Sequence, residues 1–472
     1  MSTQPQAPVA LAQATPTRRN AELALLCFAT LITVVALLIV EANQEQGISW
    51  DLASSTLAFL TLFFVCAHLA IRRFAPYADP VLLPVVALLN GLGLVMIHRL
   101  DLVGGAIAPP QHGPSEEQQM LWTLVGVLGF ALVVVFLKDH RILARYGYTC
   151  GLVGLVLLAI PALLPSHFSE TNGAKIWIRF PPGFSIQPAE FSKILLLIFF
   201  AAVLVAKRDL FTTAGKHFLG TDVPRPRDLA PLLVAWIVSV GVMVFEKGFG
   251  HFASAVRLVP GDGLHRDRAV QLGGHRSDAV RRRQRGGLLL VRPCARAGSD
   301  LAGSVRRPPR RHRLSNGAVA VQFRNRRHLR HRLGNGQPGT VPAASTDFIT
   351  AAVGEELGLV GLAGVLMLYA IVIVRGLRTA IAVRDSFGKL LAAGLASTLA
   401  IQLFIVVGGV TGGLIPLTGL TTPWMSYGGS SLVANYLLLA ILVKISHAAR
   451  RPIITNPHAP IASSSTEVIE RV

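Results

Sequence analysis

The sequence contains a series of apolar windows, each of about the length that a helix needs to cross a lipid bilayer. Ten windows with few or no charged residues occur at 23–40, 52–71, 81–97, 120–137, 146–164, 191–206, 229–245, 352–374, 390–408 and 432–443. A helix rises 1.5 Å per residue, so roughly 20 apolar residues span a hydrocarbon core about 30 Å thick. A mean hydropathy of +0.53 and a charged fraction of 15% agree with this pattern. The chain is therefore predicted to be an all-α polytopic membrane protein.

Basic residues flank alternate ends of these windows, which predicts the orientation of the chain. The clusters are Arg18, Arg19, Arg72, Arg73, Lys138, Arg141, Arg145, Lys207, Arg208, Arg225, Arg227, Arg375, Arg378, Arg450 and Arg451. Glu41 and Glu45 fall on the opposite side. We therefore expect a multi-pass protein of the cell inner (plasma) membrane, with flexible cytoplasmic termini at 1–20 and 448–472. The loops 165–189 and 410–430 should face outward.

One block, residues 248–332, differs sharply in composition from the rest. It holds 20 Arg and 4 Asp, a net charge of +16 out of +20 for the whole chain, and it lacks Lys, Glu, Ile, Met, Thr, Trp and Tyr. Basic segments that bind nucleic acid usually mix Lys with Arg, so we expect no nucleic-acid partner. An Arg-rich loop, a disordered insertion and out-of-frame translation of a GC-rich gene are the three interpretations. We favour the frameshift.

The residues themselves test the frameshift. If one nucleotide is dropped, residues 300–332 permit a mixed polar and glycine-bearing sequence that contains DPFADP and rejoins the frame at Leu333. Residues 254–266 likewise permit a membrane span. The frameshift would then have removed two membrane spans, so the intended protein would have twelve spans in total. The predicted organisation is a first part with seven spans (21–247), the Arg-rich block, and an outer-loop end with three spans (333–447).

Three intact stretches carry a family resemblance. They are 172–178 (NGAKIWI) with 183–193 (GFSIQPAEFSK), 346–348 (TDF) with 354–358 (GEELG), and 416–420 (PLTGL) with Pro423 and 426–431 (SYGGSS). Together they resemble the SEDS family of the RodA/FtsW type, in family order and over most of residues 80–450. The resemblance implies a SEDS-type helical bundle with additional N-terminal spans. It favours an actinobacterial, elongation-type member, although the sequence does not separate elongation from division.

Polar residues of the first stretch are candidates for substrate binding. Gln187, Glu190 and Lys193 are spaced i, i+3 and i+6 at the start of a predicted span. Such groups near lipid usually face a wet cavity or a partner, and the alternative is an interfacial ion pair at a helix start. Lys175 and Arg179, beside Trp177, would either meet a pyrophosphate or extend to the lipid headgroups.

The second and third stretches add further candidates. Asp347 belongs to the TDF motif, and Glu355 with its neighbour invites a metal or acid/base interpretation. The alternative is a helix start, where acidic residues are favoured by the dipole. The turn comprises Ser426, Tyr427, Gly428, Gly429, Ser430 and Ser431. Its amides could bind an anion, or its small residues could serve close helix packing. No His or Asp partner lies near the serines in sequence, which argues against a nucleophilic hydrolase.

The resemblance implies that the intended protein is a peptidoglycan glycosyltransferase. Members of this family polymerise lipid II, release undecaprenyl pyrophosphate and act with a class B penicillin-binding protein. The catalytic base would be the second Asp of DPFADP, whose codon falls across Arg307 and Pro308, so no catalytic residue is present and the chain as printed is expected to be inactive. A lipid II flippase and a non-catalytic scaffold for a transpeptidase remain alternatives. No cofactor is certain, although a divalent cation (Mg or Mn) would offset the leaving charge.

Overall fold

The computed structural model describes residues 17–43, 50–104, 115–171, 174–180, 184–207, 216–218, 221–223, 341, 343–410 and 419–452. The predicted span at 229–245, the Arg-rich block, the outer-loop end at 333–340, most of the flexible termini and part of the loop 410–430 lie outside these residues.

Helices make up most of this described part. In chain order they are α1 (Arg19–Ala42), α2 (Trp50–Phe74), α3 (Leu82–Gly104), α4 (Ser115–Phe136), α5 (Ile142–Arg145), α6 (Gly147–Leu163), α7 (Ser166–Ser169), α8 (Ala189–Ala206), α13 (Ile349–Ala382), α14 (Ser386–Val410) and α15 (Gly429–Arg450). Eight of them are long and apolar enough to cross a membrane, and α6 is a shorter apolar helix. Nine of the ten predicted spans are thus confirmed as helices, and the tenth is the one at 229–245.

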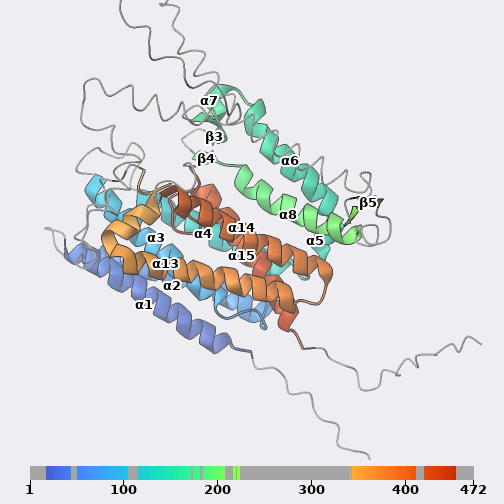
Figure 1. Cartoon of the computed structure of the whole chain (residues 1–472). Helices are drawn as coiled ribbons and strands as arrows, with labels where there is room; N and C mark the ends of the chain where they lie inside the picture. Colours follow the sequence, from blue (N-terminus) through green and yellow to red (C-terminus); the bar gives the residue numbers. More distant parts are fainter. Residues whose placement is uncertain are drawn as a thin grey trace, which may run out of the picture.

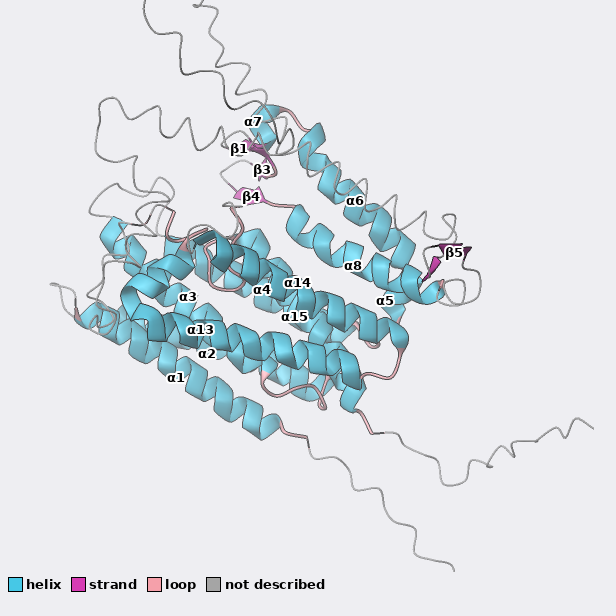
Figure 2. Cartoon of the chain, viewed as in Figure 1, coloured by secondary structure: helices cyan, strands magenta, loops and turns pink. Residues whose placement is uncertain are grey.

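Short strands form three antiparallel two-stranded pairs. β1 (Glu170–Thr171) pairs with β2 (Ala174–Lys175), β3 (Ile178–Phe180) with β4 (Phe184–Ile186), and β5 (Lys216–Phe218) with β6 (Thr221–Val223). The first two pairs follow α6 and precede α8, within the loop predicted at 165–189. Figure 2 shows them at the end of the molecule where α6 ends and α8 begins.

The long helices lie alongside one another in one bundle (Figure 1). α15 packs against α4, α13 against α14 and α3, and α1 against α3 and α2, whereas α6 and α8 form a pair that joins the bundle through α14 and α15. The apolar core includes Leu82, Phe130, Leu399 and Leu439, which come from four different helices. The helices α3 and α15 are the most buried, at 89% and 78% of their apolar windows.

The burial of α15 explains why it is longer than the predicted window 432–443. It carries the buried polar residues Asn435, Lys444 and Ser446. Lys444 Nζ donates to the carbonyl oxygens of Phe74 and Val134, both at 3.2 Å, at the ends of α2 and α4. Polar groups within the membrane region are tolerated where protein rather than lipid surrounds them. Sequence hydropathy alone therefore ended this helix too early.

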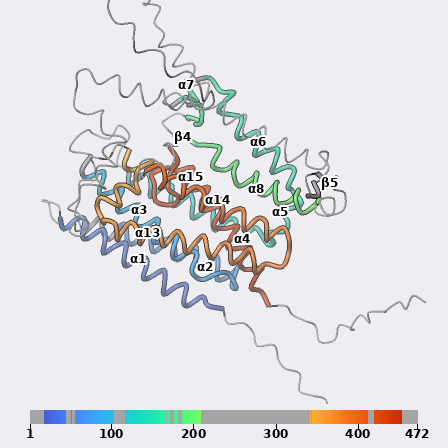
Figure 3. Tube along the Cα trace, in the orientation of Figure 1, coloured from blue at the N-terminus to red at the C-terminus, as the bar shows by residue number. Residues whose placement is uncertain are grey.

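One end of the bundle is closed by paired charges; we call it the staple end. The first residues of α1 and the last of α15 lie there (Figure 3). The Asp79 carboxylate forms ion pairs with Arg375, at 3.4 Å, and with Arg450. The backbone N–H of Asp79 donates a hydrogen bond to the Ser446 hydroxyl. Glu22 is fully buried and pairs with Arg19 and with His68, the latter at 2.9 Å.

Candidate functional site

The three motif stretches meet at the other end of the bundle, which we call the motif end. It comprises residues 98–104, 115–119, 175–180, 184–193, 345–358, 402 and 419–435. Here α3, α8 and α13 have one end each, and α15 begins. Stretches more than 200 residues apart in sequence therefore contribute to one surface of the molecule. That gathering is the first condition for a shared site.

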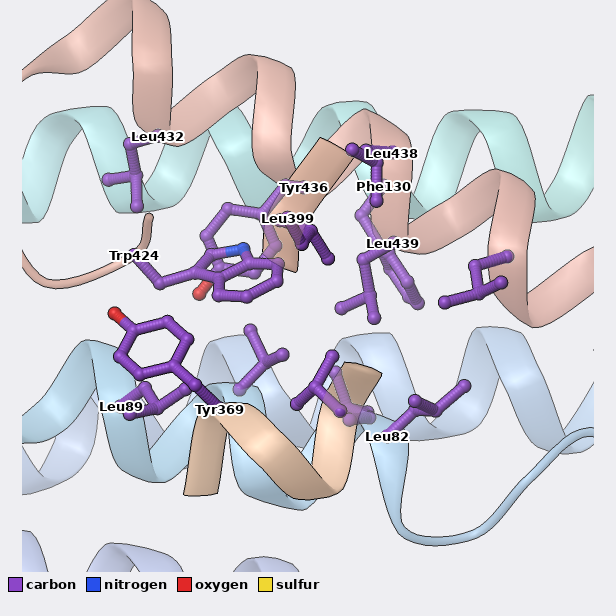
Figure 4. Packing of buried hydrophobic residues seen from close by; sticks show 14 of the residues in the cluster. Leu82, Leu89, Phe130, Tyr369, Leu399, Trp424, Leu432, Tyr436, Leu438 and Leu439 are labelled. Carbon is purple, nitrogen blue, oxygen red and sulfur yellow. The ribbon is translucent and has the colours of Figure 1, made fainter. Parts of the chain in front are cut away.

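Trp424 anchors the segment that leads into α15. Its side chain is 1% exposed and stacks on Tyr369 of α13, with ring centroids 6.3 Å apart (Figure 4). The Tyr369 hydroxyl donates to the carbonyl of Pro423. Trp424 has a φ of 60°, a conformation that residues with a Cβ rarely adopt. The indole ring thus fixes a strained turn against the core, and residues 425–431 follow from a rigid base.

Hydrogen bonds to neighbouring elements then position the SYGGSS turn. Ser426 Oγ donates to the carbonyl of Thr346 at 2.5 Å, and the Tyr427 N–H donates to the carbonyl of Ser345 at 2.7 Å. From α4, Gln119 Nε2 donates to the Ser426 carbonyl at 3.1 Å, and its Oε1 receives the Gly428 N–H at 3.4 Å. The second and third motifs are therefore bonded directly to each other.

The Tyr427 side chain adds another contact with α4. Its hydroxyl donates to Gln118 Oε1. Burial, together with the nearby Asp101 carboxylate, raises the pKa of the Tyr427 phenol above its ordinary value. The phenol therefore stays protonated at neutral pH and keeps its role as a donor.

The glycines and serines of this turn pack closely. A Cβ at Gly429 would lie 2.0 Å from the Trp122 ring, and one at Gly428 would lie 3.2 Å from Thr421. Ser430 and Ser431 are 3% and 4% exposed. The geometry favours the packing interpretation of these small residues, because the Tyr427 and Gly428 amides are already used within the protein.

A chain of polar contacts links the first motif to the third. Lys193 Nζ donates to Glu190 Oε2 at 2.6 Å and to Gln402 Oε1 at 3.1 Å. Gln402 Nε2 donates to the carbonyl of Thr421 at 2.9 Å, and Thr421 Oγ1 donates to Ser431 Oγ at 2.7 Å. The chain thus runs from α8 through α14 into α15.

The sequence placed Gln187 on the same helical face as Glu190 and Lys193, and this was wrong. α8 begins at Ala189, so Gln187 precedes the helix, and its carbonyl accepts the Glu190 N–H at 3.2 Å. Pro188 stands at the N-cap position, where its missing N–H costs no helical bond. Only the Glu190–Lys193 pair, three residues apart, has the predicted geometry.

Asp347 is a half-buried carboxylic acid just before α13. Burial raises the pKa of its carboxyl above the ordinary value. A Cβ at Gly419 would lie 3.6 Å from Asp347 Oδ2, so the carboxyl faces the segment that leads into the turn. Within the described part of the chain, no basic side chain forms an ion pair with it.

Glu355 and Glu356 do not start a helix, so the dipole interpretation was wrong. α13 begins at Ile349 and has no acidic residue in its first turn. Both side chains are buried, and Glu356 Oε1 lies 3.2 Å from Nε of Arg99 on α3. Gly358, at φ 69°, then breaks the helical geometry directly after them. The pair thus belongs to a buried contact between α13 and α3.

The remaining predicted residues lie on the strand pairs. Lys175 ends β2, Trp177 follows it, and Arg179 lies in β3 opposite Ser185. Trp177 and Lys175 are half-buried, and Arg179 is exposed. In the described ranges, no hydrogen bond or ion pair joins Lys175 to Glu190 or Lys193. These residues share the motif end with the polar chain but are not part of it.

Several residues of this site were not predicted from the sequence. They are Glu41, His98, Arg99, Glu116, Gln118, Gln119, Gln402, Thr421 and Trp424. A polar residue inside or at the edge of an apolar window is the signal that could have found Gln402 and His98. No such signal pointed to Trp424 in the sequence. Tryptophan is common near membrane interfaces, so its presence there does not indicate a site.

The described residues contain no preformed cluster of metal ligands. Among them, no group of three or more His, Cys, Asp or Glu side chains could hold a metal ion.

Comparisons with known proteins agree with the motifs. The family model described as "Cell cycle protein", which covers FtsW, RodA and SpoVE, matches residues 80–259 and 331–451. This chain belongs to that family. It is 66% identical over 484 positions to the peptidoglycan glycosyltransferase RodA of Mycobacterium tuberculosis, with 100% of each chain covered. It is 62% identical over 492 positions to the protein of the same name from Mycobacterium leprae, again with 100% of each covered.

Solved structures show the same fold. A chain from a structure described as "structural coordination of polymerization and crosslinking by a peptidoglycan synthase complex" aligns with a TM-score of 0.52 and 23% identity. The alignment covers 79% of this chain and 98% of that one. The family match includes all three motif stretches. It begins after α1 and α2 and leaves out residues 260–330.

Proposed function

We propose that this chain, in its intended reading frame, is a membrane peptidoglycan glycosyltransferase that polymerises lipid II into glycan strands. The observation that carries the proposal is the polar chain from Glu190 to Ser431, which joins two family motifs within a bundle built for lipid. Polar groups that are expensive in such a place are typical of a binding pocket rather than of a simple anchor. The identity to the mycobacterial glycosyltransferases supports the same function.

Lys193 is suited to the leaving group of this reaction. An ammonium has three N–H donors, and Glu190 and Gln402 accept two of them. No other described residue accepts the third donor, which is available to a ligand, and the side chain is 20% exposed. A positive group held in fixed geometry stabilises the charge that develops on a departing pyrophosphate. In this proposal Lys193 orients undecaprenyl pyrophosphate, and Glu190 holds Lys193 in place.

The base that deprotonates the acceptor sugar would come from the block 248–332. In the alternative frame this base is the second Asp of DPFADP, which the printed chain does not contain. The gap of the family match, 260–330, falls within the block and supports the frameshift. We therefore expect the printed chain to be inactive in polymerisation while its motif end remains assembled.

The finer assignments follow from the same proposal. The motif end faces outward, both termini are cytoplasmic, and a class B penicillin-binding protein cross-links the product. A divalent cation (Mg or Mn) would have to be held largely by the substrate phosphates, because the described residues contain no preformed cluster of metal ligands.

The test compares three purified proteins in liposomes with lipid II: the printed chain, a frame-restored chain, and the restored chain with the proposed base changed to Ala. Only the restored chain should make glycan, and a lipid II translocation assay should not depend on that Asp. Translocation without polymerisation by the restored chain would favour the flippase. Partner binding with neither activity would favour the scaffold. Glycan made by the printed chain would disprove the assignment of the base.

A further inference from the structure

A buried triad connects α1 to the motif end. His98 Nε2 lies 2.5 Å from Glu41 Oε1, and His98 Nδ1 lies 2.6 Å from Glu116 Oε2. The three side chains are 5 to 7% exposed and come from α1, α3 and α4. Glu41 lies outside the region that the family model matches, whereas His98 and Glu116 lie inside it.

The protonation state of this triad determines the strength of its two hydrogen bonds. A neutral imidazole has one N–H donor and one acceptor nitrogen, and an acceptor nitrogen cannot bond to a carboxylate oxygen. His98 can therefore form hydrogen bonds to both carboxylates only if the group of a neutral imidazole and two carboxylates takes up one additional proton. The triad then has a net charge of −1 and two charge-assisted hydrogen bonds, which are stronger than neutral ones. Removing the Glu41 carboxylate breaks one bond and leaves a buried ring nitrogen without its partner.

Glu116 connects the triad to the SYGGSS turn through the first turn of α4. Its own N–H donates to Asp101 Oδ2 at 2.9 Å, so the first turn of α4 is fixed to α3 through both backbone and side chain. Two and three residues further on, Gln118 and Gln119 hold Tyr427, Ser426 and Gly428. The position of α4 at this end therefore sets the position of the turn.

We propose that Glu41 is a positioning residue, which holds the SYGGSS turn through His98, Glu116 and the first turn of α4. The helix α1, although it precedes the family-matched region, is then a working part of the motif end and not only a membrane anchor. The significance of this for catalysis rests on the proposed glycosyltransferase function. The structural part of the proposal does not.

Hydrogen–deuterium exchange of the full printed chain in detergent tests the structural part, because it needs no activity. Glu41→Gln should speed exchange of the amides of Tyr427 and Gly428 about tenfold, because the glutamine amide can offer His98 only a neutral hydrogen bond in place of a charge-assisted one. The control is Glu22→Gln, which changes a buried carboxylate of the same helix at the staple end. It should leave the exchange of these two amides within about twofold of the parent chain.

Two results would overturn the proposal: unchanged exchange in Glu41→Gln, or an equal rise in Glu22→Gln, which would mean that α1 docking as a whole is responsible. If Glu41→Gln does not fold, Glu41→Asp and Glu22→Asp replace the pair with the same criteria, since each keeps the charge but shortens the reach. The double variant Glu41→Gln/His98→Gln should raise the exchange of these amides by less than the two single variants together, because both changes act on the same contact.

The catalytic part is tested in the frame-restored chain. There Glu41→Gln should lower kcat about tenfold with KM within about twofold, and Glu22→Gln should change neither. An inactive restored chain would count against the proposed function, while the exchange result would still decide the role of Glu41. A restored chain that is active and insensitive to Glu41→Gln would overturn the positioning role in catalysis.

Discussion

The two ends of the bundle use polar groups in different ways. At the staple end the buried acids Glu22 and Asp79 are matched by arginines and a histidine. At the motif end, charged pairs such as Arg99–Glu356 and Lys193–Glu190 occur together with neutral bonds between side chains and backbone, as at Ser426 and Gln402.

Among the described residues, the motif end keeps bonding capacity within reach of solvent, in the third donor of the partly exposed Lys193 and in the half-buried carboxyl of Asp347. At the staple end the polar atoms that have no hydrogen-bond partner in the described part of the chain, Arg19 Nε and His68 Nε2, are buried. The difference teaches that bonding capacity within reach of solvent, more than charge density, distinguishes the end at which we propose that the ligand binds.

The largest effect should come from Asp79→Ala at the staple end. This change leaves Arg375 and Arg450 without their shared carboxylate. Breaking a buried ion pair costs 3–5 kcal/mol, and because both arginines are about one-third exposed we expect roughly 3 kcal/mol. Thermal unfolding in detergent should show the loss, and Asp79→Asn should lose less. A frame-restored chain with Asp79→Ala should keep its activity per folded molecule. A fall in the activity per folded molecule would contradict the comparison of the two ends.

The next effect should come from Lys193→Ala at the motif end. In the frame-restored chain we expect kcat/KM for lipid II to fall about 100-fold, the usual cost of removing one fixed group that stabilises developing charge. Lys389→Ala changes an exposed lysine near the staple end and serves as the control. An equal loss in both variants would remove the distinction between the ends.

Close packing under the SYGGSS turn gives a third, smaller effect. A Cβ at Gly93 would lie 2.6 Å from the Met425 carbonyl oxygen, so Gly93→Ala must shift backbone and should destabilise by about 2 kcal/mol. At Gly364 a Cβ meets nothing within 4 Å, so Gly364→Ala should be neutral or stabilising by about 0.5–1 kcal/mol. Thermal unfolding of both variants checks this, and equal melting temperatures would show that the turn can yield.

The smallest effect concerns Asp347. Its raised pKa means that the folded state binds the proton more tightly than the unfolded chain does, so ionisation at neutral pH opposes folding. Asp347→Asn should therefore raise the melting temperature at pH 7 by about 1–2 °C. The difference should vanish as the pH falls towards the ordinary pKa of 3.8. A melting temperature that drops at pH 7 would reveal a stabilising partner for the carboxylate.

Most of the bundle was predictable because lipid imposes a simple rule on length and polarity. The windows at 52–71 and 191–206 became α2 and α8, whose ends differ from the windows by at most three residues. The errors occur where protein replaces lipid as the surroundings. Lys444 and Ser446 made α15 look shorter than it is, and the acidic pair at 355–356 suggested a helix start although α13 begins at Ile349.

The candidate site was only partly predictable. Glu190 and Lys193 could be paired from their spacing, because contacts between residues three apart on a helix are local. Their connection to Gln402 and Ser431 joins three helices and depends on how these pack. The same holds for His98, whose two carboxylate partners are 57 and 18 residues away. Spacing rules say nothing about contacts of this kind.

The break at Gly358 also bears on how the chain enters the bilayer during synthesis. After it, residues 359–374 form an uncharged part of α13. At 1.5 Å per residue this part extends for about 24 Å, so it crosses most of the hydrocarbon core, and Arg375 and Arg378 after it can extend to the headgroups. The insertion machinery can therefore accept this apolar segment while Glu355 and Glu356 remain at the boundary. A glycine in a left-handed conformation thus separates the part of α13 that lipid selects from the part that binds Arg99.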